Sequence, residues 1–192
     1  MANPNFPFGL KPVRDRSGRA WNGAAEAFPV LASDSTALAV GDPVQLAGSS
    51  LNGRPTVTRA TAAGGNFIFG VVIGMGNDPV ALRAGYRAAS TLSEVLVCTD
   101  PELLFEIMAD DDAATLAATD VGLNADLIAG SADLVNRVSG FMLDTSTKAT
   151  TATLQLKIEG IVNDGLNEIA VAKQRVLVSI NLHQRRNTTG IS

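Results

Sequence analysis

Apolar and polar residues alternate with a period of two along much of this chain, a pattern that is typical of half-buried β-strands. The alternation is clearest over residues 153–162 and again over residues 175–183. The apolar positions that share one face are Leu154, Leu156, Ile158 and Val162 in the first segment, and Val176, Val178, Ile180 and Leu182 in the second. The positions expected to point outward in the second segment are Ser179, Asn181 and His183. Residues 163–165 are predicted to form a turn between the two strands.

Three further segments are predicted to be more deeply buried strands. Residues 67–73 are apolar on both faces and too short for a solitary helix, which indicates a central strand. Residues 92–98 and 103–108 are also predicted strands, separated by a turn at residues 99–101. These segments would supply much of the core.

Proline and glycine mark the places where strands should end or bend. Residues 38–46 alternate, but Pro43 interrupts them, so they form either an edge strand or two short strands joined at a bend. A loop is expected over residues 48–50 and at the strong turn signal Asn52-Gly53.

One segment favours a helix, and the rest of the chain returns to strands. Residues 110–118 could form a short helix capped by aspartates. Residues 121–127 alternate again. Roughly eight to ten short strands at this spacing favour a β-sandwich or barrel. The predicted fold class is therefore all-β, with a β-sandwich or jelly-roll-like body over residues 25–184 and at most one short helix.

The first 24 residues are different and are predicted to form an extended N-terminal arm. Pro4, Pro7 and Pro12 fix the backbone and remove amide donors, so this segment cannot enter a helix or a central strand. The residues that could hold a partner protein are the aromatic anchors Phe6 and Phe8 and the cations Lys11, Arg14, Arg16 and Arg19. An alternative is that the two phenylalanines cover the protein's own core.

Charge is spread unevenly along the 192 residues. The whole chain carries −4, the first 19 residues carry +3, and Arg185 and Arg186 add +2 in a basic tail over residues 185–192. Residues 20–184 therefore carry −9. An acidic body argues against wrapping a nucleic acid, which requires a basic stripe on the folded surface. Basic ends instead fit an acidic protein partner, unless both ends are simply solvated tails.

Residues that could carry catalysis or hold a metal are few. With one histidine, His183, and one cysteine, Cys98, a zinc site or a disulfide within the chain is excluded. We expect Cys98 to be a small core residue. The run Asp110, Asp111 and Asp112 lacks the alternating ligands of a calcium-binding loop. We therefore expect neither an enzyme nor a cofactor.

No segment of the sequence predicts contact with a membrane. The N-terminus has none of the regions of a secretory signal, and the longest apolar run, residues 67–75, is far too short to span a bilayer. We expect the protein to be made and kept in soluble form.

Several stretches together resemble the capsid cement, or decoration, proteins of tailed bacteriophages. The stretches are residues 5–14 (NFPFGLKPVR), 21–24 (WNGA), 40–44 (VGDPV), 68–72 (IFGVV), 86–87 (YR), 95–97 (VLV), 100–101 (DP), 104–107 (LFEI), 121–127 (VGLNADL) and 178–183 (VSINLH). Each motif alone is unspecific, so the resemblance depends on their order and spacing along nearly the whole chain.

The resemblance implies a β-sandwich subunit on the outer surface of the phage head, commonly a homotrimer, that bridges and stabilises major capsid protein subunits. It implies no catalytic residue and no cofactor. On this basis we expect copies to associate through the apolar faces of residues 153–162 and 175–183. We expect Phe6 and Phe8 to dock in capsid pockets while the arm cations pair with capsid carboxylates.

Two other classes stay open on the sequence. One is a tail, baseplate or receptor-binding protein of the virion, which would be present in few copies. The other is a carbohydrate-active jelly-roll enzyme, although only Trp21 and Tyr86 offer large amphipathic rings for sugar stacking.

Overall fold

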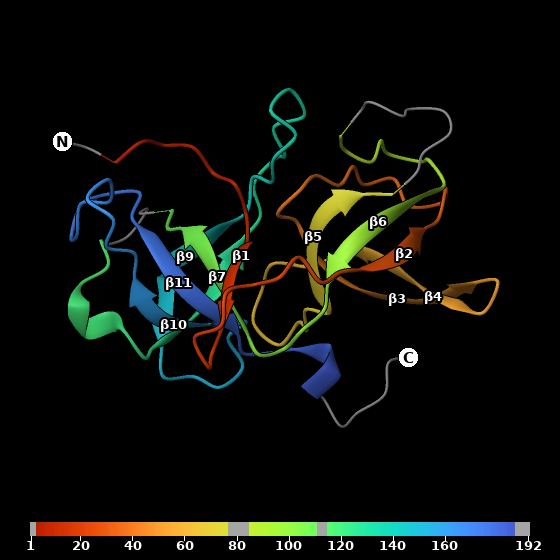
Figure 1. Cartoon of the computed structure of the whole chain (residues 1–192). Coiled ribbons are helices and arrows are strands. Elements are labelled where there is room, and N and C mark those ends of the chain that lie inside the picture. The colour runs from red at the N-terminus through yellow and green to blue at the C-terminus, as the bar shows by residue number, and fades with distance from the viewer. Residues whose placement is uncertain (1–2, 77–84, 111–114, 187–192) are drawn as a thin grey trace.

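The chain folds into two antiparallel β-sheets, as a computed structural model that describes residues 3–76, 85–110 and 115–186 shows (Figure 1). The six-stranded sheet has the order β1 (Lys11–Asp15), β7 (Leu103–Met108), β11 (Arg175–Ile180), β10 (Leu156–Ile161), β8 (Asn124–Ile128) and β9 (Met142–Ala149). The five-stranded sheet has the order β2 (Glu26–Val30), β6 (Ser93–Cys98), β5 (Gly70–Met75), β3 (Pro43–Leu51) and β4 (Arg54–Arg59). The predicted all-β, sandwich-like fold class is confirmed.

Helical structure within the described residues is limited to two single 3-10 turns. These are η1 (Ala118–Asp120) and η2 (Gln184–Arg186). Neither of these turns is long and apolar enough to cross a membrane, and no other helix occurs in the described part of the chain.

Both sheets curl around apolar side chains, and one strand joins the two cores. In the five-stranded sheet the edge strands β2 and β4 contact each other and enclose a cluster that includes Phe28, Val57 and Val72. The second cluster fills the six-stranded sheet and extends to Val71 and Cys98 of the other. Neighbouring residues of β5 thus face different cores, because successive strand residues point to opposite faces. The central strand predicted over residues 67–73 is found as β5, but it covers Gly70–Met75 and only its first half is buried.

The β3–β4 hairpin confirms one predicted turn and corrects a predicted loop. Asn52 and Gly53 both have positive φ (52° and 79°), as a two-residue hairpin turn requires, and Leu51 pairs with Arg54. Residues 48–50 belong to β3 and do not form a loop. A shift of register between Leu46 and Ser50 absorbs the extra length, as a β-bulge does.

Residues 38–46 form two short extended pieces joined at a bend, which is one of the two forms predicted. Leu38 and Val40 make single bridges to Arg87 and Val138, and β3 begins only at Pro43. The bend between them contains Gly41, whose carbonyl accepts a hydrogen bond from the N–H of Leu10.

The predicted helix over residues 110–118 is not found in the described part of that segment. Residues 111–114 lie outside the described residues, residues 115–117 are not helical, and η1 begins at Ala118. Asp110 itself is buried and accepts hydrogen bonds from the backbone N–H and the hydroxyl of Thr145, both at 2.9 Å. Its carboxylate therefore holds β9 in place.

Strands β10 and β11 have the predicted apolar faces, but the predicted outward face of β11 is wrong at two positions. Ser179 and His183 are both buried. Ser179 is covered because its hydroxyl bonds Glu159 and Arg16, each at 2.7 Å. His183 is covered because the chain leaves the sheet after Ile180 and forms an isolated bridge with Ile68, which precedes β5.

The apolar faces of β10 and β11 are used within the chain. Their buried side chains are Leu156, Ile158, Val176, Val178 and Ile180, all members of the core of the six-stranded sheet. The prediction that copies associate through these two faces is therefore wrong, since neither face is exposed.

Candidate functional site

The N-terminal arm lies on the body of its own chain and is attached at two points. The first attachment is Asn3, whose side chain is buried against the loop between β10 and β11. Asn3 Nδ2 donates to the carbonyls of Glu168 and Ala172, both at 3.0 Å, and its Oδ1 accepts from Glu168 N at 2.8 Å. Three hydrogen bonds fix the start of the arm to a loop more than 160 residues away in the sequence.

The second attachment is Gly9-Leu10, at the bend before β3. Leu10 is fully buried and its N–H donates to the Gly41 carbonyl at 2.9 Å. Gly9 has a φ of +70°, and a Cβ at this position would overlap the Gly41 carbonyl oxygen and lie 2.5 Å from Ser139 Cβ. Only glycine permits this contact without a shift of the backbone.

Between the two attachments the arm displays an aromatic side chain to the outside. Pro4 and Asn5 are exposed, and Phe6 is 49% exposed. Phe8 is half-buried and lines an apolar cavity of about 450 Å³ together with Trp21 and Ile73. The two phenylalanines, which the sequence treats as equivalent, therefore have different surroundings.

The stem of the arm is part of the six-stranded sheet. Residues 11–15 form β1, which pairs with β7 at the edge of the sheet, with Pro12 opposite Phe105. An edge position suits proline because its missing N–H then leaves no gap within the sheet.

Three of the four arm cations pair with carboxylates of this chain. Lys11 Nζ lies 3.5 Å from Glu106, Arg16 lies 2.8 Å from Glu159, and Arg19 lies 2.6 Å from Asp15. A hydrogen bond from the Ser17 hydroxyl, together with the contacts of Arg19, lowers the pKa of Asp15 to about 2. Arg14 is exposed and forms no ion pair with any residue that the structure describes.

The basic residues near the C-terminus are also paired within the chain. Arg185 lies 2.9 Å from Glu26, and Arg186 pairs with Glu102. The hydrogen bond from Arg185 lowers the pKa of Glu26. Arg185 therefore lies against β2 of the five-stranded sheet, and Arg186 lies against the turn between β6 and β7.

Two loops that touch the ends of the arm also expose apolar side chains. The loop that receives Asn3 exposes Leu166 (79%) and Ile169 (50%). The loop of residues 131–138, whose base contacts Gly9 through Ser139, exposes Val135 (89%) at its projecting tip. In Figure 1 the red arm runs from the first loop, in blue, towards the base of the second, in teal.

His183, Cys98 and Trp21, which were considered for chemistry, have structural surroundings. Burial, with Arg186 and Arg185 nearby, lowers the pKa of His183 to about 4, and burial raises the pKa of the Cys98 thiol to about 11. Trp21 packs against the core, which favours a packing role over sugar stacking. No group of three or more His, Cys, Asp or Glu side chains in the described ranges could hold a metal ion. Asp111 and Asp112 lie outside them.

Comparison of the chain with protein-family models, curated proteins and solved structures finds no match. The resemblance to capsid cement proteins therefore stays an expectation from the sequence. The attachments at Asn3 and Gly9 were not predicted, and the one local signal for the second was a glycine between two bulky apolar residues.

Proposed function

We propose that this chain is a structural protein of a tailed-bacteriophage virion, a capsid cement protein that binds the outer surface of the head. It would bridge and stabilise major capsid protein subunits and act as a homo-oligomer, without a cofactor, a nucleic acid or a membrane as partner. The observation that carries the proposal is the exposed Phe6, held outward on an arm that is fixed at both ends.

This arrangement suits binding because the arm is ordered before it meets a partner. Ordering a free segment costs roughly 1–2 kcal/mol per residue in conformational entropy. Because the arm is attached at Asn3 and at Gly9-Leu10, it loses this entropy when the chain folds. Less conformational entropy is then lost when the arm binds a partner. Phe6 then acts as a buried aromatic anchor, and the exposed side chains of Leu166, Ile169 and Val135 extend the apolar surface.

Charge has a smaller part in this mechanism than the sequence suggests. Lys11, Arg16 and Arg19 are engaged within the chain, so a partner carboxylate would have to compete for them. Arg14 is the arm cation best placed for a carboxylate on the capsid protein. Because exposed ion pairs contribute only about 0–1 kcal/mol, the aromatic anchor and the many copies on a lattice must dominate.

The test is co-sedimentation of the purified chain with expanded empty heads that lack it. We expect Phe6→Ala to weaken binding at least tenfold, and more than Arg14→Ala, because an aromatic anchor is a typical hot spot. Leu92→Ala is the matched control, since Leu92 is similarly exposed (52%) but lies outside the arm and both loops. Equal or smaller loss from Phe6→Ala than from Arg14→Ala would overturn the role of the arm.

Copy number separates the head from the tail. A cement protein is present in hundreds of copies per virion, whereas a tail, baseplate or receptor-binding protein is present in few. Quantitative mass spectrometry of purified virions, with the major capsid protein as reference, measures this ratio directly.

A further inference from the structure

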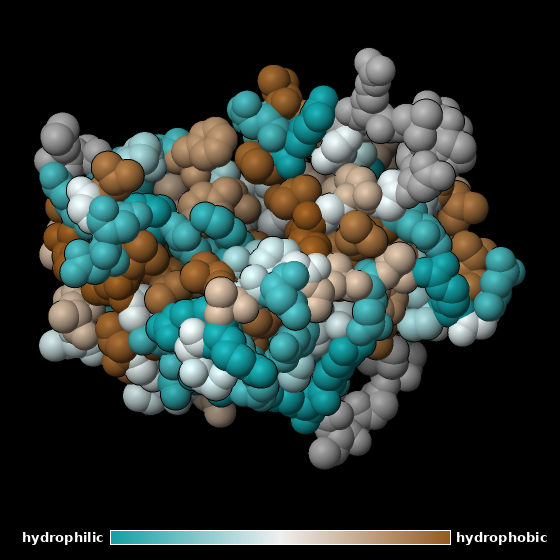
Figure 2. Space-filling view, viewed as in Figure 1, coloured by the Kyte–Doolittle hydropathy of each residue, from teal (hydrophilic) through white to brown (hydrophobic). Residues whose placement is uncertain are grey.

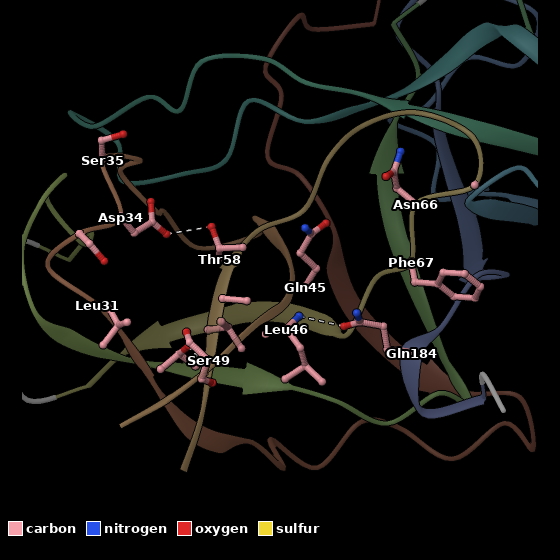
Figure 3. A pocket seen from close by; sticks show the side chains of 16 residues that line it. Leu31, Asp34, Ser35, Gln45, Leu46, Ser49, Thr58, Asn66, Phe67 and Gln184 are labelled. Carbon is pink, nitrogen blue, oxygen red and sulfur yellow. Dashed lines mark hydrogen bonds between the residues drawn. The ribbon is translucent and has the colours of Figure 1, made fainter. Parts of the chain in front are cut away.

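A second surface, unrelated to the arm, has the form of a binding groove. It has a volume of about 910 Å³ and is built on the β3–β4 hairpin, with walls from residues 31–35 and 65–67 and from Gln184 of η2 (Figure 3). Eight of its sixteen lining residues carry a hydroxyl or a carboxamide group. Representative lining residues are Asp34, Gln45, Ser49, Thr58, Asn66 and Gln184.

Two carboxamides in the groove are held in place while their donors stay available. Gln184 Oε1 accepts the N–H of Leu46 at 2.9 Å, and Gln45 Oε1 accepts the N–H of Thr61 at 3.2 Å. In the described part of the chain, neither Nε2 donates to a protein acceptor. Each glutamine therefore presents two fixed N–H bonds to a ligand without having to be ordered first.

The groove is close to electrically neutral. Its one acidic side chain, Asp34, accepts hydrogen bonds from the Thr58 hydroxyl and the Thr36 N–H, both at 2.8 Å. The buried guanidinium of Arg87 lies 3.8 Å behind this carboxylate and compensates its charge. No lysine or arginine is among the described residues that line the groove, so nothing there favours a sulfate, a phosphate or a nucleic acid.

The lining also argues against a peptide. Peptides are recognised by apolar pockets or by pairing with an open strand edge. The apolar lining residues on the hairpin, such as Leu46 and Val57, are flanked by polar ones, so the groove contains no purely apolar pocket. The neighbouring edge strand β4 lies against β2 without pairing with it, so a peptide would have to displace β2 to pair with β4.

From these observations we propose that the groove binds a neutral oligosaccharide. Hydroxyls, carboxamide donors and one carboxylate acceptor match the alternating donors and acceptors of a sugar chain. Leu46 provides apolar surface for the C–H faces of its rings. The proposal is independent of the arm and of the virion role.

Side-chain amide NMR of the purified chain is the test. The probes are maltohexaose, cellohexaose and chitohexaose, with a hexagalacturonate of equal length as anionic control and an extended Ser/Thr-rich peptide as the competing class. We expect at least one neutral hexasaccharide to shift the carboxamide signals of Gln45 and Gln184 at millimolar concentration, and the two controls to leave them unchanged. Absence of a shift with all three neutral sugars, or equal binding of either control, would overturn the proposal.

Variants localise the effect. Gln45→Glu and Gln184→Glu each keep an acceptor for the backbone N–H but remove the free donors, and together they should weaken binding at least tenfold. Asn163→Asp makes the same chemical change on an exposed loop of the other sheet and should bind like the unmodified chain. Equal affinity of the double variant and the control would contradict the assignment.

Discussion

At the scale of single residues, one buried guanidinium holds together the loops at one end of the five-stranded sheet. Arg87 is 1% exposed, yet its N–H groups donate to backbone carbonyls from separate segments. The acceptors are the carbonyls of Leu31, Asp34, Thr36 and Thr91. Removing the side chain would take the donors from these partly buried carbonyls and would leave a cavity where the guanidinium is buried.

We therefore predict that Arg87→Ala destabilises the fold by about 3–5 kcal/mol, as removal of one partner of a buried charged group does. Arg87→Lys should recover only part of this loss, because an ammonium cannot reproduce the planar fork of donors. Urea denaturation measures both changes. Arg54→Ala, which removes an exposed arginine paired with Glu94, is the control with a smaller loss. A loss from Arg87→Ala no larger than the control's would contradict this role.

The one histidine predicts a pH dependence of stability. The pKa of His183 is lowered from 6.5 to about 4, mainly by burial, so the folded state keeps it neutral. As pH falls from 6.5 towards 4, the unfolded chain binds a proton that the folded chain does not, and stability decreases. Below about 4 both states are protonated and the loss levels off.

Comparison with a variant isolates this effect, because the pKa values of the Asp42 and Asp126 carboxyls are raised by burial and change stability in the opposite direction. We predict that the fall in unfolding free energy between pH 6.5 and pH 4 is smaller in His183→Gln by a few kcal/mol. Urea titrations at several pH values measure it. Identical slopes for both proteins would contradict the burial of a neutral imidazole.

At the scale of elements, the arm depends on a backbone contact that two glycine variants separate. An alanine at position 9 would need a positive φ, and its Cβ would overlap the Gly41 carbonyl. An alanine at position 18 would also need a positive φ, but its Cβ would meet no atom within 4 Å. We predict that Gly9→Ala frees residues 3–8 to protease or to amide exchange, while Gly18→Ala leaves their protection unchanged. Equal protection in the two variants would show that the second attachment does not hold the arm.

The sequence predicts where the strands lie better than it predicts which of their polar side chains are buried by distant parts of the chain. The two clearest period-two segments became β10 and β11, because local alternation decides a strand and its apolar face. The burial of Ser179 and His183 depends on Arg16 and Ile68, which lie more than 100 residues away. No local pattern carries that information.

The arm shows the same limit. Its prolines correctly predict an extended segment that avoids the centre of a sheet, and β1 is indeed an edge strand. Whether Phe6 or Phe8 faces outward depends on contacts to Gly41 and Ser139 across the fold. The groove was not predicted either, because its lining residues come from separate segments of the sequence.

At the scale of the whole molecule, most of the basic residues near the two ends of the chain form ion pairs with carboxylates of the same chain. The basic ends lie on the acidic body through pairs such as Arg16–Glu159 and Arg185–Glu26. The face in Figure 2 accordingly mixes polar and apolar patches without separating into large regions of one kind. Among the described residues, the features open to a partner include the outward Phe6, the apolar loop tips and Arg14, which pairs with no described carboxylate.

The most direct test of the central proposal is cryo-electron microscopy of purified virions. We predict regular protrusions on the outer shell into which this fold fits, with residues 4–8 against the major capsid protein and Phe6 in contact with it. Density for the chain only at the tail, its absence from particles, or an arm that faces away from the capsid would contradict the account.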